Sequence, residues 1–130
     1  MITIKFRGKD IETGEWIYGD LIQRLGYYPA ILTTYPTGEG KVGYAERAVK
    51  EDTVGQFSTL RDKNGKEIYA GDIIRAGEEK TLLEVRFVRG VFAFLWNGDL
   101  DDEFPCNAPT QEWAEVAGNI HDNPKMIKRK

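Results

Sequence analysis

The chain has few of the residues from which catalytic and metal sites are usually built. It contains one cysteine and one histidine in 130 residues. The single cysteine, Cys106, excludes an intramolecular disulfide and a cysteine-based zinc site. The single histidine, His121, offers little for nucleophilic catalysis, which needs a base within hydrogen-bonding reach of the nucleophile. We therefore expect His121 to be a turn residue and Cys106 an inert thiol, in a protein without catalytic residues or a cofactor.

Long apolar runs and phosphate-binding loops are also missing. No stretch reaches the length of a signal peptide or a membrane span, which predicts a soluble, cytoplasmic protein. Gly38-Glu39-Gly40 is not followed by Gly-Lys-Ser/Thr, so we expect no nucleotide site there. The proline and two glycines of residues 36–40 predict a surface loop. The net charge of −3 argues against a protein that binds duplex nucleic acid. A chain with this net charge can still carry a local basic patch.

The residues that are abundant favour a turn-rich β protein. A hydrophobic fraction of 41% supports a packed interior, and 14 glycines and five prolines supply turns. We predict a mainly β fold with an N-terminal β-hairpin lobe at 1–60, a small SH3-like barrel of about five strands at 61–124 and a basic tail at 125–130. The first hairpin is expected to bend at Gly19-Asp20, and Trp96 and Trp113 are expected to be buried in the second lobe.

One stretch, residues 62–74 with the sequence DKNGKEIYAGDII, dominates the pattern. Asn64-Gly65 predicts a tight turn, because both residues tolerate positive φ. Gly71-Asp72 before two isoleucines predicts the entry of a strand. An earlier stretch, residues 14–22, repeats the pattern Ile-Tyr followed by Gly-Asp and two aliphatic residues. We interpret the shared and turn-forming residues as structural: Tyr18, Gly19, Asp20, Asn64, Gly65, Tyr69, Gly71 and Asp72.

These motifs resemble the YopX family of phage and prophage proteins. The resemblance is carried by VGQFSTLR followed by DKNGKEIYAGDII, by KFRGK with TGEWIYGDL near the start, and by VAGNIHDNP near the end. One departure is Thr59, which stands where the family more often has glycine, so the turn at that point is expected to differ. The resemblance implies a small, mainly β, phage-encoded protein, and it carries over no catalytic residues.

Two sets of charged residues are candidates for a binding site. Basic residues surround the central motif, and the weak candidates for nucleic-acid binding are Arg61, Lys63, Lys66 and Arg75. The acidic run from Asp99 to Glu103 could hold Mg²⁺ or Ca²⁺, but it lacks the spacing of a calcium-binding loop and a solvated loop is the simpler interpretation. The paired carboxylates of Asp20 and Asp72 are interpreted as turn residues that accept backbone N–H groups.

Three functional classes follow. The favoured one is an uncharacterised phage accessory protein that is not an enzyme and binds a phage or bacterial host protein, with a homo-oligomer as a further possibility. The alternative is a small β-barrel protein that binds nucleic acid, and the second alternative is a metal-dependent enzyme. The sequence identifies neither the partner nor the stage of the phage cycle.

Overall fold

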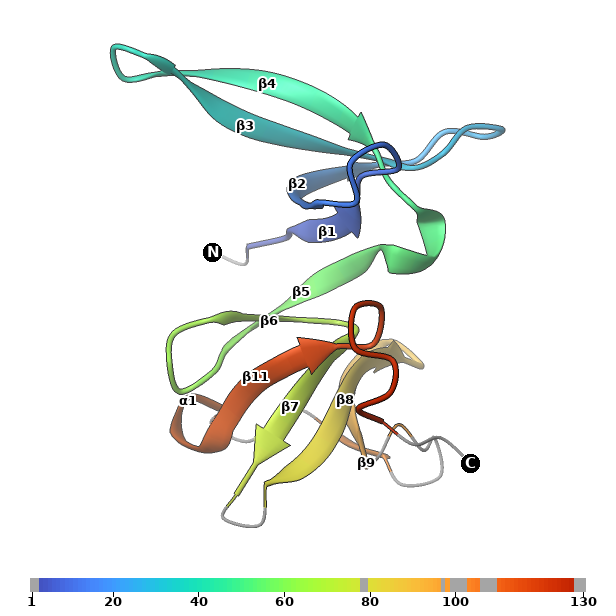
Figure 1. The fold of residues 1–130 in the computed structure, drawn as a ribbon, viewed down its shortest axis with the longest axis vertical. Helices are drawn as coiled ribbons and strands as arrows, with labels where there is room; N and C mark the ends of the chain where they lie inside the picture. Colours follow the sequence, from blue (N-terminus) through green and yellow to red (C-terminus); the bar gives the residue numbers. More distant parts are fainter. Residues whose placement is uncertain (1–2, 78–79, 97, 99–102, 106–109, 128–130) are drawn as a thin grey trace. The chain divides into compact units, whose positions relative to one another are not determined.

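A computed structural model describes residues 3–77, 80–96, 98, 103–105 and 110–127, with the backbone alone at 103–105 (Figure 1). The chain divides into two compact units, residues 1–56 and 57–130. The elements are β1 (Phe6–Lys9), β2 (Trp16–Ile22), β3 (Ala30–Gly38), β4 (Lys41–Ala48), the 3-10 helix η1 (Glu51–Thr53), β5 (Gly55–Arg61), β6 (Glu67–Tyr69), β7 (Asp72–Ala76), β8 (Thr81–Val88), β9 (Val91–Trp96), β10 (Glu103–Pro105), α1 (Thr110–Trp113) and β11 (Ala114–Asn119). The mainly β class is confirmed.

The first unit is an antiparallel sheet in the order β4-β3-β2-β1, to which the first two residues of β5 add a short pairing with β1. Ile31 and Val49 are fully buried in this unit. Gly8 allows β1 to pass closely over Val49, because a Cβ at Gly8 would lie 2.8 Å from the Val49 Cγ2 atom. The absence of a side chain at this position therefore sets how tightly the sheet can pack.

Two expectations about the first unit are wrong. β2 runs without a register shift through Gly19, where a Cβ would lie 2.0 Å from the carbonyl oxygen of Leu32, so this glycine serves a close approach and not a bend. The predicted loop at 36–40 is mostly strand, because β3 continues to Gly38 and β4 begins at Lys41. The reversal needs only Glu39 and Gly40, which have φ values of 53° and 73°.

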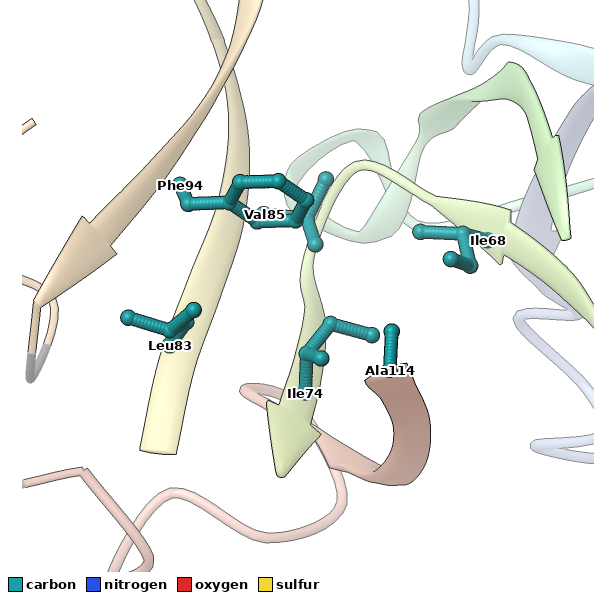
Figure 2. Packing of buried hydrophobic residues seen from close by; sticks show 6 residues of the cluster. All are labelled: Ile68, Ile74, Leu83, Val85, Phe94 and Ala114. Atoms are coloured by element: carbon teal, nitrogen blue, oxygen red, sulfur yellow. The ribbon is translucent and has the colours of Figure 1, made fainter. Parts of the chain in front are cut away.

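The second unit contains an antiparallel sheet in the order β10-β9-β8-β7-β11. β7, β8 and β9 follow one another as a meander of antiparallel strands. A hairpin formed by the rest of β5 and β6 packs on this sheet through Ile68. Figure 2 shows this core, in which the fully or nearly buried side chains come from five strands; they are Ile68, Ile74, Leu83, Val85, Phe94 and Ala114.

The structure contains no closed SH3-like barrel among the described strands, and one of the two tryptophans expected to be buried is exposed. The described strands of the five-stranded sheet leave β10 and β11 at its two edges and close no barrel. Trp113 is partly buried and packs its ring against Phe94 with centroids 5.3 Å apart. Trp96, the last residue of β9, is 47% exposed. No helix in the described part of the chain is long and apolar enough to cross a membrane.

Thr59 occupies an unusual backbone conformation in β5. The pairing of β5 with β6 shifts register between Phe57 and Arg61, and Thr59 in this interval has a φ of 71°. A β-branched residue in the left-handed region is strained, whereas glycine is not. The Ser58 hydroxyl stabilises the irregular strand by donating to the Ile68 carbonyl at 2.7 Å and accepting from the Leu60 N–H at 3.1 Å. Thr59 thus occupies a backbone conformation that favours glycine.

Candidate partner-binding surface

The four basic residues proposed for nucleic-acid binding lie in the second unit, where nearby carboxylates neutralise most of their charge. The Arg61 guanidinium donates to the Gly65 carbonyl at 3.2 Å and lies 3.5 Å from a carboxylate oxygen of Glu67. This places Arg61 within its own hairpin as a brace between β5 and β6. A phosphate group would have to compete with Glu67 for the same guanidinium, which weakens it as a backbone contact.

Glu115 of β11 gathers two more of the predicted cations. Its carboxylate oxygens lie 3.3 Å from the Lys63 Nζ atom and 2.5 Å from the Arg75 Nη1 atom. The Lys63 and Arg75 charges lower the pKa of Glu115 below its usual value, in that order of strength. Lys66 is exposed, and its backbone N–H donates to the Asp62 carboxylate. The structure therefore brings the four cations to one region, together with the carboxylates of Asp62, Glu67 and Glu115.

Asp62 is the residue on which the central motif is built, and the sequence pattern did not single it out. Its Oδ1 atom accepts the N–H groups of Asn64 and Lys66 at 2.9 Å, and its Oδ2 atom accepts the Val116 N–H at 2.9 Å. Burial alone would raise the pKa of Asp62, but these three N–H donors and the charge of Lys66 lower it overall. One carboxylate thus holds the β5–β6 turn and attaches it to β11.

The predicted turn at Asn64-Gly65 is present. Gly65 has a φ of 80°, and its N–H donates to the Asp62 carbonyl at 2.9 Å. Gly71 has a φ of 96°, and the buried Asp72 carboxylate accepts the Tyr69 N–H at 2.8 Å. This hydrogen bond agrees with the interpretation of Asp72 as a residue that stabilises a turn.

The internal repeat does not produce equivalent sites. Tyr69 is 2% exposed and its hydroxyl donates to Glu67 at 3.0 Å, whereas Tyr18 is 43% exposed on β2. Asp20 is exposed and lies opposite Leu32, whereas Asp72 is buried. The two stretches share a local strand pattern, but their side chains have different surroundings, so the repeat builds no paired carboxylate site.

The acidic run and the cysteine lie where the side chains are not described. Asp99, Asp101 and Asp102 fall outside the described residues, as does Cys106, and only the backbone of Glu103 is described. Within the described part of the chain, no group of three or more His, Cys, Asp or Glu side chains is placed to hold a metal ion. The predicted metal site on this run stays a hypothesis.

The first unit exposes an unusual number of tyrosines. The chain has six tyrosines, and the five in this unit are all at least 43% exposed. The largest exposed group lies in the loop between β2 and β3, residues 23–28, which we call the tyrosine loop. Leu25, Tyr27 and Tyr28 in this loop are 101%, 76% and 65% exposed. The sequence pattern did not single out this surface, because composition does not reveal which apolar residues of a loop stay exposed.

A shallow pocket adjoins the tyrosine loop. It has a volume of about 170 Å³ and is lined by residues of β2, the loop, η1 and the segments beside it: Leu21, Gln23, Arg24, Tyr27, Pro29, Glu51 and Val54. Arg24 is held in place by two hydrogen bonds to Glu46 of β4, at 2.9 and 2.6 Å. The Arg24 charge lowers the pKa of Glu46. The ion pair thus ties the loop to the sheet and leaves its apolar side chains facing solvent.

Comparison with known proteins places the chain among structures of the same fold. It is similar to the crystal structure of protein EF1440 from Enterococcus faecalis, with a TM-score of 0.60, 20% identity and coverage of 98% of this chain and 100% of that one. It is also similar to protein yopX from Bacillus subtilis, with a TM-score of 0.58, 19% identity and coverage of 97% of both chains. No curated protein sequence matches the chain. The family model described as YopX protein matches residues 5–128, and the chain therefore belongs to the YopX family.

Proposed function

We propose that this protein is a non-enzymatic binding module that acts through protein–protein contacts, and that the tyrosine loop is its contact surface. The observation that carries the proposal is the exposure of Leu25, Tyr27 and Tyr28 within four residues of one short loop. Single exposed apolar residues are common on protein surfaces, but a contiguous group marks an interaction site more often. Tyrosine is enriched among the residues that dominate binding energy, because it offers a large apolar face and a hydroxyl.

The adjoining pocket fits this function better than it fits catalysis. A volume of about 170 Å³ is below the range of roughly 300–1,000 Å³ that small-molecule sites occupy. It suits one anchoring side chain of a protein partner, such as a leucine or a phenylalanine. The lining combines the apolar residues Leu21 and Val54 with the charged residues Arg24 and Glu51, so it offers a partner both apolar and polar contacts.

The chemistry of the second unit supports nucleic-acid binding less well. Its candidate cations face Glu67 and Glu115, so few of their charges are available to release counterions from a nucleic acid. We keep this function as the alternative and metal-dependent catalysis as the second one. We further propose that the protein is a phage or prophage accessory protein that acts in the cytoplasm of the bacterial host, and the family resemblance supports this origin.

The test is affinity capture from host cells with the tagged full-length chain and two variants. The first variant, Leu25→Ser/Tyr27→Ser/Tyr28→Ser, removes the apolar surface of the loop. The matched control, Phe87→Ser/Val91→Ser, removes apolar side chains that are 49% and 54% exposed in the second unit. We expect a host or phage protein that the unmodified chain and the control retain after nuclease treatment, and that the loop variant loses.

Three outcomes would count against the proposal. Equal capture by the loop variant and the unmodified chain would show that the loop is not the contact surface. Capture that disappears with nuclease in every sample would favour the nucleic-acid alternative and direct mutagenesis at the cations around Glu115. A rise in melting temperature with Mg²⁺, Mn²⁺ or Ca²⁺ would instead favour the metal-dependent alternative, since a ligand of the native state raises its stability.

A further inference from the structure

The outer part of the β3–β4 hairpin pairs with no third strand in the described part of the chain. β2 pairs with β3 only from Ala30 to Leu32, whereas β4 pairs with β3 up to Gly38 (Figure 1). Beyond Leu32 the hairpin is therefore a ribbon of two strands. A two-stranded ribbon is at best marginally stable in water, and three or more strands are needed for independent stability. This part of the first unit would be stabilised by a third strand.

β4 offers a free edge for such a strand. It lies at the end of the strand order of its sheet in the described part of the chain, and it is eight residues long. Natural edge strands are protected by proline, by bulges, by charged side chains or by very short length. The charged residues of β4 are Lys41, Glu46 and Arg47, and they flank the uncharged segment from Val42 to Ala45. β4 contains no proline, and the register shift of this hairpin lies at its tip, between Pro36 and Gly38. Val42 and Tyr44 on β4 are 57% and 66% exposed.

We propose that this edge pairs with β4 of a second copy of the chain, antiparallel and centred on Gly43. Two identical antiparallel strands related by a two-fold axis place each residue opposite the one equally far from the centre. Centring on Gly43 puts Val42 opposite Tyr44 on both sides of the axis. Aromatic and β-branched residues form favourable cross-strand pairs. The four side chains would bury one another on a single face of the extended sheet.

The neighbouring registers are less favourable. Centring on Tyr44 places Lys41 opposite Arg47, and like charges directly opposite each other are destabilising. It also places Val42 opposite Glu46. Centring on Ala45 places Tyr44 opposite Glu46 and leaves Val42 at the end of the pairing. The charge pattern of β4 therefore selects the Gly43 register.

The surroundings of Gly43 suit the centre of such an interface. Tyr35 lies opposite Gly43 on β3, and a Cβ at Gly43 would come within 2.5 Å of the Tyr35 Cζ atom. The tyrosine ring thus covers the position on the face away from Val42 and Tyr44. A glycine in a strand often marks a place where another backbone approaches closely. At the axis, two glycines would meet, with one Tyr35 ring from each copy over them.

The experiment measures the mass of the full-length chain by sedimentation equilibrium over a concentration series. We expect a dimer for the unmodified chain. Val42→Lys and Tyr44→Lys should each raise the dissociation constant at least tenfold, because they place an ammonium group against an apolar partner. Val91→Lys is the matched control, since it changes an exposed apolar residue of the second unit and should leave the dimer intact. Circular dichroism melting curves verify that each variant is folded.

A double variant tests the register. In Val42→Glu/Tyr44→Lys the new glutamate lies opposite the new lysine only if the strands are centred on Gly43, so the dimer should be recovered relative to Tyr44→Lys. A monomeric unmodified chain, a dimer indifferent to both single lysines, or a double variant no better than Tyr44→Lys would each overturn the proposal. The result is independent of the tyrosine loop, because partner capture can fail while the dimer persists, and the reverse.

Discussion

Replacing Asp62 is the strongest test of how the second unit is held together. Asp62→Ala removes the acceptor of three backbone N–H groups, two in the β5–β6 turn and one on β11. A hydrogen bond to a charged group contributes roughly 1.5–3 kcal/mol, and buried donors left without a partner cost about 1–3 kcal/mol each. The three bonds share one side chain and are not additive. We therefore expect a loss of about 3 kcal/mol in the free energy of unfolding.

An exposed aspartate of the first unit supplies the control for this substitution. Asp20 occupies the position equivalent to Asp72 in the first stretch and is exposed, so Asp20→Ala should change stability by no more than about 0.5 kcal/mol. Both variants can be compared by urea unfolding monitored with circular dichroism. A loss below about 1 kcal/mol in Asp62→Ala would refute the reasoning, since even one ionic hydrogen bond exceeds it.

The pH dependence of the free energy of unfolding gives an independent test of the role of Asp62. The pKa of Asp62 is lower in the folded protein than in the unfolded chain. A carboxylate with a lowered pKa contributes stability above its unfolded pKa of about 3.9, and this contribution is lost as the pH falls through the folded value. We expect the unmodified chain to lose stability below about pH 4, and Asp62→Asn to lose less of it over the same range. Parallel pH profiles would contradict the assignment.

Three further substitutions have expected outcomes. Thr59→Gly should raise the free energy of unfolding by about 0.5–1 kcal/mol, because relief of left-handed strain exceeds the entropic cost of glycine; a lower melting temperature would contradict this. Gly19→Ala should destabilise the chain by about 2 kcal/mol or more, because its Cβ would meet the Leu32 carbonyl, and unchanged unfolding would count against that contact. Glu115→Gln should strengthen salt-dependent binding of an oligonucleotide by releasing Lys63 and Arg75; no change would show that these cations form no latent site.

Local patterns predicted the parts of the fold that depend on neighbouring residues. Asn64-Gly65 forms its turn because positive φ and the Asp62 side chain act within four residues. The β7–β9 meander follows from short turns between strands with clear alternation. In contrast, the continuation of β3 into the predicted loop at 36–40 depends on its pairing with β4. The two glycines and the proline of this stretch are typical of a loop, so the sequence pattern did not predict the strand.

Long-range contacts account for what the sequence could not predict. Tyr18 and Tyr69 have the same local pattern, but one is exposed and the other packs against Phe57 at 5.4 Å between ring centroids. The pairing of Lys63 and Arg75 with Glu115 joins positions at least 40 residues apart and places one carboxylate between two of the predicted cations. The exposure of the tyrosine loop likewise depends on which segments cover it, which composition does not reveal.

The bond between Asp62 and Val116 has a consequence for the order in which the chain folds during synthesis. It joins residues 54 positions apart, whereas all strand pairings of the first unit lie within residues 1–56. Ribosomes add roughly 5–20 residues per second, so residue 116 follows residue 56 by about 3–12 s. During that interval the strands of the first unit are already available to pair, while the Asp62 turn still lacks its third donor. The order of synthesis therefore allows the strand pairings of the first unit to form before the contacts that complete the core of the second unit.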